Sequence, residues 1–140
     1  MTGQLKRSAS LVEIVIAAGL FAVVMLGIAS MVISVGRSNA FSNEQAAAMA
    51  AAAEKLEELK VLDATTLFTN HNGETFDVTR TVDNKAITLD VNPAANRAKP
   101  GLVTIEPIGN GNFVRVRIQV DWLSTNGTGN FELTWGRGTQ

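Results

Sequence analysis

The sequence predicts an α+β fold, in which one long N-terminal α-helix packs on a small antiparallel β-sheet. Three observations support this fold class: an apolar stretch over residues 11–35, a run of strong helix formers from Glu44 to Leu62, and alternating apolar and polar residues after Thr75. The chain has 140 residues. That length leaves room for one small folded unit beside an apolar anchor.

The apolar stretch from Leu11 to Val35 contains one charged side chain, that of Glu13. About 20 apolar residues cross the hydrocarbon core of a bilayer, so the stretch is long enough to span it with some tilt. A carboxylate inside a membrane segment costs on the order of 2.5–3.5 kcal/mol on insertion scales, and such groups usually face a partner. Glu13 is therefore a candidate functional residue.

Two ordinary interpretations of this stretch stay open. In one, it is a secretory signal peptide with a basic start at Lys6 and Arg7, and cleavage after Ala40 releases a secreted binding domain. An apolar signal region, however, usually runs only about 7–15 residues. In the other, it is a plain signal anchor for a monomeric periplasmic domain, and Glu13 reaches the headgroups.

The residues around the start of the stretch favour a third interpretation. Lys6-Arg7-Ser8 followed by Ala9-Ser10-Leu11-Val12-Glu13 and an unbroken apolar helix resembles the processing site of type IV prepilins and pseudopilins. The resemblance implies cleavage between Ser8 and Ala9, N-methylation of Ala9, and an assembly role for Glu13 together with Leu11 and Val12. Two positions depart from the family pattern: the usual leader glycine is Ser8, and the usual aromatic first residue is Ala9.

The physical chemistry of this motif agrees with an assembly role. Cleavage before Ala9 would free an α-amino group about 6 Å along the helix from Glu13, at 1.5 Å per residue. Opposite charges attract strongly in low dielectric, and staggered neighbours could bring the amine of one subunit to the Glu13 of another. We expect the ion pair to set the alignment of subunits more than to add stability.

The resemblance also implies partners and a location. The partners are other pilin or pseudopilin subunits, a prepilin peptidase and an inner-membrane assembly platform with its ATPase. The implied location is a single pass of the inner membrane with a cytoplasmic N-terminus, then a periplasmic or extracellular filament. Lys6 and Arg7 lie before the apolar stretch, and this basic flank favours the same orientation.

The predicted organisation has four parts: a leader at 1–8, a transmembrane and polymerisation helix at 9–36, an amphipathic extension of that helix at 37–62, and a β-sheet domain at 63–140. Apolar residues in the extension recur at spacings of three and four, which predicts a stripe that packs on the sheet. The stripe consists of Met49, Ala52, Leu56, Leu59 and Leu62.

The C-terminal part reads as short strands joined by turns. We expect a strand over Thr75–Val82, a turn at residues 83–85, and a second strand around Ile87–Val91. Residues 92–101 are expected to form an exposed loop, and a short strand over Leu102–Glu106 is expected to end at Pro107.

The clearest strand is Val114–Trp122. Even-numbered apolar residues should face inward and odd-numbered polar ones, including Arg115, Arg117 and Asp121, should face solvent. A turn is expected over residues 124–130, then a strand in which Phe131, Leu133 and Trp135 alternate with polar residues, then a loose tail at 136–138. This hairpin resembles the C-terminal hairpin of minor pilins of the PilV kind and of I-type minor pseudopilins of type II secretion.

Composition and motifs give no sign of catalysis or of a cofactor. The chain has no cysteine and a net charge of −1, so it has neither thiolate metal ligands nor a basic field for nucleic acid. The single histidine, His71, stands among loop formers and is expected to be solvated, and Arg115 and Arg117 read as a solvated strand face. We therefore expect no enzyme, no cofactor and no metal. The resemblance to prepilins implies instead a minor structural subunit of a type IV pilus or a secretion pseudopilus.

Overall fold

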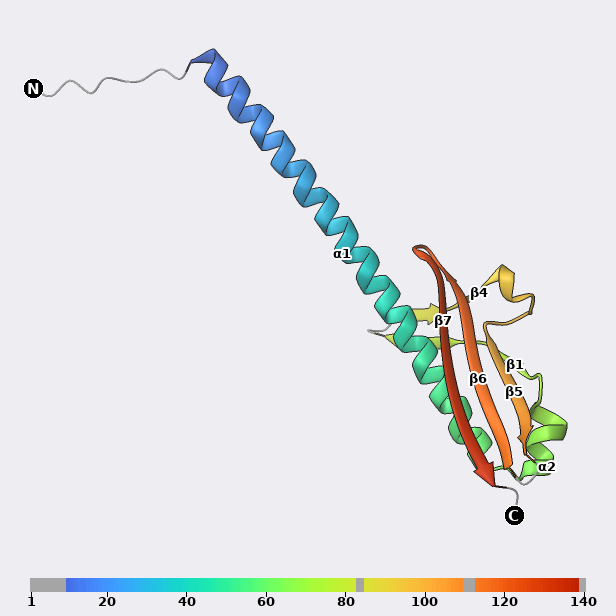
Figure 1. Cartoon of the computed structure of the whole chain (residues 1–140). Helices are drawn as coiled ribbons and strands as arrows, with labels where there is room; N and C mark the ends of the chain where they lie inside the picture. The colour runs from blue at the N-terminus through green and yellow to red at the C-terminus, as the bar shows by residue number, and fades with distance from the viewer. Residues whose placement is uncertain (1–9, 83–84, 110–112, 139–140) are drawn as a thin grey trace, which may run out of the picture. The chain divides into compact units, whose positions relative to one another are not determined.

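The computed structural model describes residues 10–82, 85–109 and 113–138. Helix α1 runs from Leu11 to Lys60. The chain divides into two units, Met1–Ser38 and Asn39–Gln140. The described part of the first unit is the N-terminal part of α1, and the second unit contains the rest of α1 and all the described strands (Figure 1). The α+β fold class predicted from the sequence is confirmed.

The main sheet of the second unit is antiparallel and centres on β6 (Phe113–Ser124). β6 pairs with β5 (Gly101–Ile108) from Phe113 to Val120, and with β4 (Asp90–Val91) at Trp122 and Leu123. β7 (Gly127–Gly138) pairs with β6 along its whole length, without a break in register. β1 (Thr75–Phe76) adds to β5 at Gly101 and Leu102.

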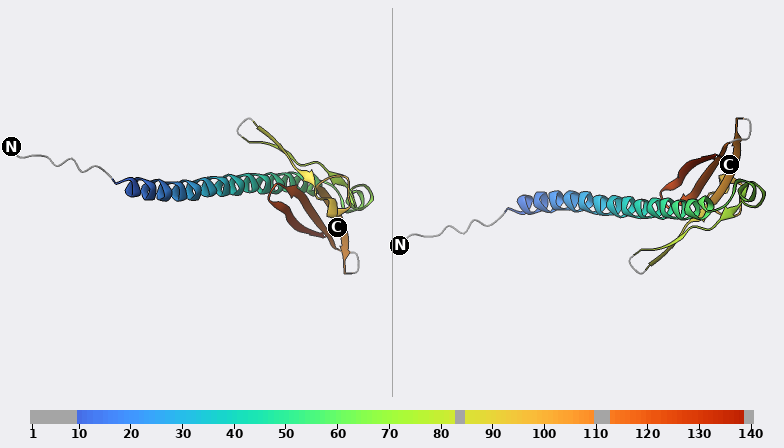
Figure 2. Two further views of the ribbon diagram at one scale, coloured as in Figure 1. Left: turned by 90° about the horizontal axis from the view of Figure 1, so that it is seen from above. Right: turned by 90° about the horizontal axis from the view of Figure 1, so that it is seen from below.

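A separate two-stranded sheet is formed by β2 (Thr79–Val82) and β3 (Lys85–Thr88). We call this hairpin the arm. Both views in Figure 2 show it extending away from the main sheet of its unit. The strand predicted over 75–82 is therefore interrupted after Phe76, and the strand predicted around 87–91 is interrupted at Leu89. Val78 and Leu89, the residues at these interruptions, are buried and anchor the base of the arm.

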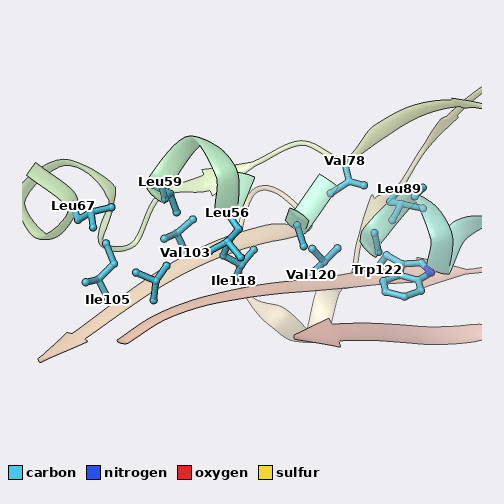
Figure 3. Close-up of a cluster of buried hydrophobic side chains, with 14 of the residues drawn as sticks. Leu56, Leu59, Leu67, Val78, Leu89, Val103, Ile105, Ile118, Val120 and Trp122 are labelled. Atoms are coloured by element: carbon cyan, nitrogen blue, oxygen red, sulfur yellow. The ribbon is translucent and has the colours of Figure 1, made fainter. Parts of the chain in front are cut away.

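The core of this unit lies between the C-terminal part of α1 and one face of the main sheet (Figure 3). The even-numbered residues of β6 face the helix, as the alternation predicts, because successive side chains of a strand point to opposite faces. Trp122 is the largest of the fully buried side chains. The other buried apolar residues of the sheet are Val103, Ile105, Val114, Val116, Ile118 and Val120.

The buried stripe of α1 differs from the prediction at both ends: Leu62 lies beyond the last helical residue, Lys60, and is only partly buried, and Met49 is not part of the stripe. Met49 is 48% exposed, and the stripe instead includes Ala47 and Ala48 before Ala52, Leu56 and Leu59. Leu56 and Leu59 pack against the sheet and thereby set how the helix is rotated about its axis. At that rotation Met49 lies outside the contact between the helix and the sheet. Alanines at the contact allow the helix to approach the sheet closely, which a long methionine side chain would prevent.

Three predicted boundaries on the strands are wrong. β5 continues through Pro107 to Ile108, the turn predicted over 124–130 shortens to residues 125 and 126, and the tail predicted at 136–138 belongs to β7. Pro107 is tolerated because the N–H groups of Val103 and Ile105 point away from β6, toward Glu74 and Asn72. By alternation the nitrogen of Pro107 points to the same side, so no ladder bond to β6 is lost.

The segment 92–101 is partly buried, which also corrects the prediction of an exposed loop. It contains η2, a 3₁₀ helix over Pro93–Ala95, and its last two residues, Pro100 and Gly101, are buried. Within it, the Arg97 guanidinium lies 2.6 Å from the Asp121 carboxylate and donates to the Pro100 carbonyl oxygen. Asp121 therefore does not face solvent as predicted, because this segment folds over it.

Candidate assembly site

Glu13 lies in the first turn of α1, two residues after the helix begins at Leu11. The first turn of a helix presents unpaired N–H groups, and a carboxylate there interacts favourably with them. The main-chain N–H of Ile14 donates to the carbonyl oxygen of Ser10, so helical hydrogen bonding starts at the first described residue. Ser8 and Ala9, the predicted cleavage and methylation positions, lie outside the described residues.

The apolar residues that follow are exposed on every side of the first unit. Leu11 is 79% exposed, Val12 is 63% exposed, and the other large apolar side chains up to Val35 are also exposed. By length and composition, α1 is apolar enough over an 18-residue window to cross a membrane, and none of that window is buried. Soluble monomers rarely expose apolar patches of this size, so the exposed surface is compatible with a membrane anchor or a signal sequence.

Small residues along this apolar surface leave space in which another helix can approach closely. A Cβ added at Gly19, Gly27 or Gly36 would meet nothing within 4 Å. A further hollow on the same unit is lined by Leu26, Ala29, Ser30, Ile33, Ser34 and Arg37. The Ser30 hydroxyl donates to the carbonyl oxygen of Leu26, so its polarity is satisfied within the helix. Small and internally satisfied residues are those that membrane helices use at close contacts.

In the second unit, the structure brings together charged residues that sequence reasoning did not connect. The Lys55 ammonium lies 2.7 Å from one oxygen of the Glu74 carboxylate, and the His71 Nδ1 lies 2.5 Å from the other. Lys55 also pairs with Glu58 on its own helix. His71 is therefore not a solvated loop residue: it ends η1, a π-helix over Leu67–His71, and its side chain is only 20% exposed. The signal that could have suggested this cluster was the i, i+3 spacing of His71 and Glu74.

The pKa directions in this cluster follow from its geometry. Burial alone would raise the pKa of Glu74, but hydrogen bonds from Lys55 and His71 outweigh it and lower that pKa. Burial alone would lower the pKa of Lys55, but hydrogen bonds to Glu74 and Glu58 outweigh it and raise that pKa. Both groups are thus held in their charged forms. The cluster ties α1 to the segment that covers β5, which is a structural role.

The arginines on the outer face of the sheet are neutralised by carboxylates. Arg117 lies 3.4 Å from Glu132 and 3.8 Å from Glu106, and Arg115 lies 3.9 Å from Glu106. These groups are partly exposed, so each pair contributes little. Among the described residues, no group of three or more histidine, cysteine, aspartate or glutamate side chains is placed to hold a metal ion.

Comparison of the chain with protein-family models, with curated proteins and with solved structures finds no match.

Proposed function

We propose that this chain is a minor structural subunit of a type IV pilus or of a type II secretion pseudopilus. In this proposal α1 is inserted in the inner membrane and then enters a bundle of equivalent helices in a filament. The proposal rests on one observation: a single carboxylate, Glu13, stands in the first turn of a helix whose apolar side chains are all exposed up to Val35.

The carboxylate supports assembly rather than anchoring alone. An anchor needs only apolar length, which α1 has without Glu13. A buried or lipid-covered carboxylate is costly unless a cation meets it. In the proposed filament that cation is the α-amino group of Ala9 in a neighbouring subunit, freed by a prepilin peptidase that cuts after Ser8.

The rest of α1 fits the same role. Exposed apolar side chains and open glycines allow close helix packing in the first unit, and the second unit carries a folded domain on the same helix. In this proposal the assembly platform and its ATPase move the subunit from the membrane into the filament, so the domain becomes periplasmic or extracellular.

The intact mass of the protein extracted from membranes tests the processing step. Loss of residues 1–8 with one added methyl group is the expected result. Loss of residues 1–40 would instead indicate a secreted domain, and an uncut chain in assembled fibres would contradict the proposal, because no free amine at Ala9 would exist.

Substitution of Glu13 tests the assembly step. Glu13→Val should leave membrane insertion intact, because it makes the helix more apolar, and should abolish recovery of the chain in sheared filaments. Glu13→Asp is the matched control, because it keeps the charge and should retain part of the incorporation. Normal incorporation of the valine variant would refute the role of the carboxylate.

A further inference from the structure

Residues 63–74 run along the side of β5 that faces away from β6, and we call this segment the strap. Other contacts fix the chain at both of its ends. Before the strap, the Leu62 carbonyl oxygen accepts a hydrogen bond from Arg137. After it, the ring of Phe76 lies against Gly101, where an added Cβ would come within 2.5 Å of the ring. The strap is therefore a short segment that can lift between two fixed points.

Little of the strap is buried. It contains α2 (Ala64–Thr66) and η1, a π-helix, which is a rare and irregular conformation. Of residues 63–74, all of which the structure describes, Leu67 alone is buried, in the same cluster as Ile105 (Figure 3). Phe68, the other large apolar residue of the strap, is 46% exposed. Few buried apolar contacts are typical of a segment that opens at a low free energy.

Hydrogen bonds to one row of groups on β5 add to this attachment. The N–H of Val103 donates to the main-chain oxygen of Glu74 at 2.8 Å, and the N–H of Gly73 donates to the Val103 oxygen at 2.9 Å. The N–H of Ile105 donates to the side-chain oxygen of Asn72 at 2.9 Å. All three bonds lie on the side of β5 that faces away from β6, so all three break when the strap lifts.

The Glu74 carboxylate fastens the strap to α1. One of its oxygens lies 2.7 Å from the Lys55 ammonium, and the other lies 2.5 Å from Nδ1 of His71. The side chain of Lys55 is 11% exposed and that of His71 is 20% exposed, so water screens these contacts less than it screens a surface ion pair. Both oxygens of the carboxylate thus hold the strap closed, one through the helix and one within the strap.

We infer that the strap opens as one unit and uncovers the outer edge of β5, with the Glu74 carboxylate as its latch. In the open state the N–H groups of Val103 and Ile105 face water, while the pairing of β6 with β5 and with β7 is unchanged. β5 then presents a free strand edge, which the closed strap protects. This device lies in the folded domain and does not involve Glu13, so it is independent of the proposed filament function.

Exchange of single amide hydrogens tests the opening, followed by NMR on the full-length chain in detergent micelles. Val103 and Ile105 report on the strap. Thr104 between them is the matched control, because by alternation its N–H points toward β6. After correction for intrinsic rates, Val103 and Ile105 should exchange equally fast, and at least about tenfold faster than Thr104. Equal rates at all three amides would overturn the inference, because exchange would then require unfolding of the whole domain.

Two substitutions separate opening of the strap from unfolding of the domain. Glu74→Gln should speed exchange at both Val103 and Ile105 by about tenfold, since it removes hydrogen bonds to a charged group. Neither amide donates to the Glu74 carboxylate, so a change at both requires the strap to move as a unit. Gly129→Ala instead strains the contact of β7 with the indole of β6. It should speed exchange at Thr104 and leave the other two amides unchanged.

Three results would overturn the inference. One is unchanged exchange at Ile105 in the Glu74→Gln variant, and another is equal acceleration of all three amides by Gly129→Ala. The third comes from thiol labelling, which the absence of cysteine makes specific. Leu67 and Val116 are both fully buried, but only Leu67 lies on the strap. In the full-length chain, Leu67→Cys should react with a maleimide at least about tenfold faster than Val116→Cys. Equal labelling rates would show that the strap does not open separately.

Discussion

The guanidinium of Arg137 lies 2.6 Å from the main-chain carbonyl oxygen of Leu62, so the last strand of the chain closes the C-terminal end of α1. It also donates to the carbonyl oxygen of Lys60, at 3.1 Å. Carbonyl groups in the last turn of a helix have no partner within the helix, and a cation is favoured there. The contact joins residues that lie 75 positions apart in the sequence.

Replacing Arg137 by methionine should therefore destabilise the folded domain by about 1.5–3 kcal/mol, the range for a hydrogen bond to a charged group. Thermal unfolding followed by circular dichroism measures this change. Arg115→Met is the matched control, because Arg115 is partly exposed and its carboxylate partner lies 3.9 Å away. Its effect should stay within about 0.5 kcal/mol. Equal losses in the two variants would contradict the capping role.

Gly129 should not tolerate a side chain, because it lies against the indole ring of Trp122. A Cβ at this position would come within 2.2 Å of the ring atoms Cε2 and Cζ2. We expect Gly129→Ala to destabilise the domain by about 1–3 kcal/mol, since the buried ring must shift. Gly136→Ala is the control on the same strand, because its nearest neighbour would be the Val114 carbonyl oxygen at 4.0 Å. If the two alanine variants unfold at the same temperature, the predicted clash does not occur.

The ion pair between Lys55 and Glu74 should give stability a defined dependence on pH. The pKa of Glu74 is lowered from its ordinary 4.5. The contribution of Glu74 to the free energy of unfolding is therefore present above pH 4.5 and is lost as the pH falls through the lower pKa of the folded state. The pKa of Lys55 is raised from its ordinary 10.5. The contribution of Lys55 to the free energy of unfolding is therefore complete below pH 10.5 and is lost as the pH rises through the higher pKa of the folded state.

A double-mutant cycle with Lys55→Met and Glu74→Gln measures the coupling directly. The coupling free energy should be constant from about pH 5 to pH 10 and should decrease in stronger acid and in stronger base. The exposed pair of Lys60 and Glu57, which are three residues apart on α1, serves as the comparison and should show little coupling. A coupling that falls between pH 6 and pH 8 would contradict these pKa directions.

The buried face of a strand could be predicted where the alternation of side chains was the only rule that applied. The alternation of β6 identified its buried face correctly because a strand with one wet face has a period of two. The ends of strands were predicted less well, because Pro107 and the glycines of β7 read as breaks. In the folded chain, the N–H that Pro107 lacks and the side chains that the glycines of β7 lack cost little stability at an edge. β6 supplies the hydrogen-bond partners for both strands.

The candidate assembly site was visible in the sequence, whereas the charged contacts of the domain were not. Glu13 stands out because it is charged within an apolar stretch, and this contrast needs no knowledge of the fold. His71 was expected in solvent because it stands among loop formers, and Asp121 because the alternation of its strand places odd-numbered residues on the solvent face. Glu74 and Arg97 meet them only after η1 and the segment 92–101 fold back.

The sequence by itself determined the helix, the class of the fold and the position of the one carboxylate in the apolar stretch, because periodicity and hydropathy are local properties of the chain. Only the tertiary structure decided which residues of α1 are buried, which edge of the sheet stays open, and that Arg137 caps the helix. Those outcomes depend on contacts between distant residues, whose free energies are set by packing and hydrogen-bond geometry in the folded domain.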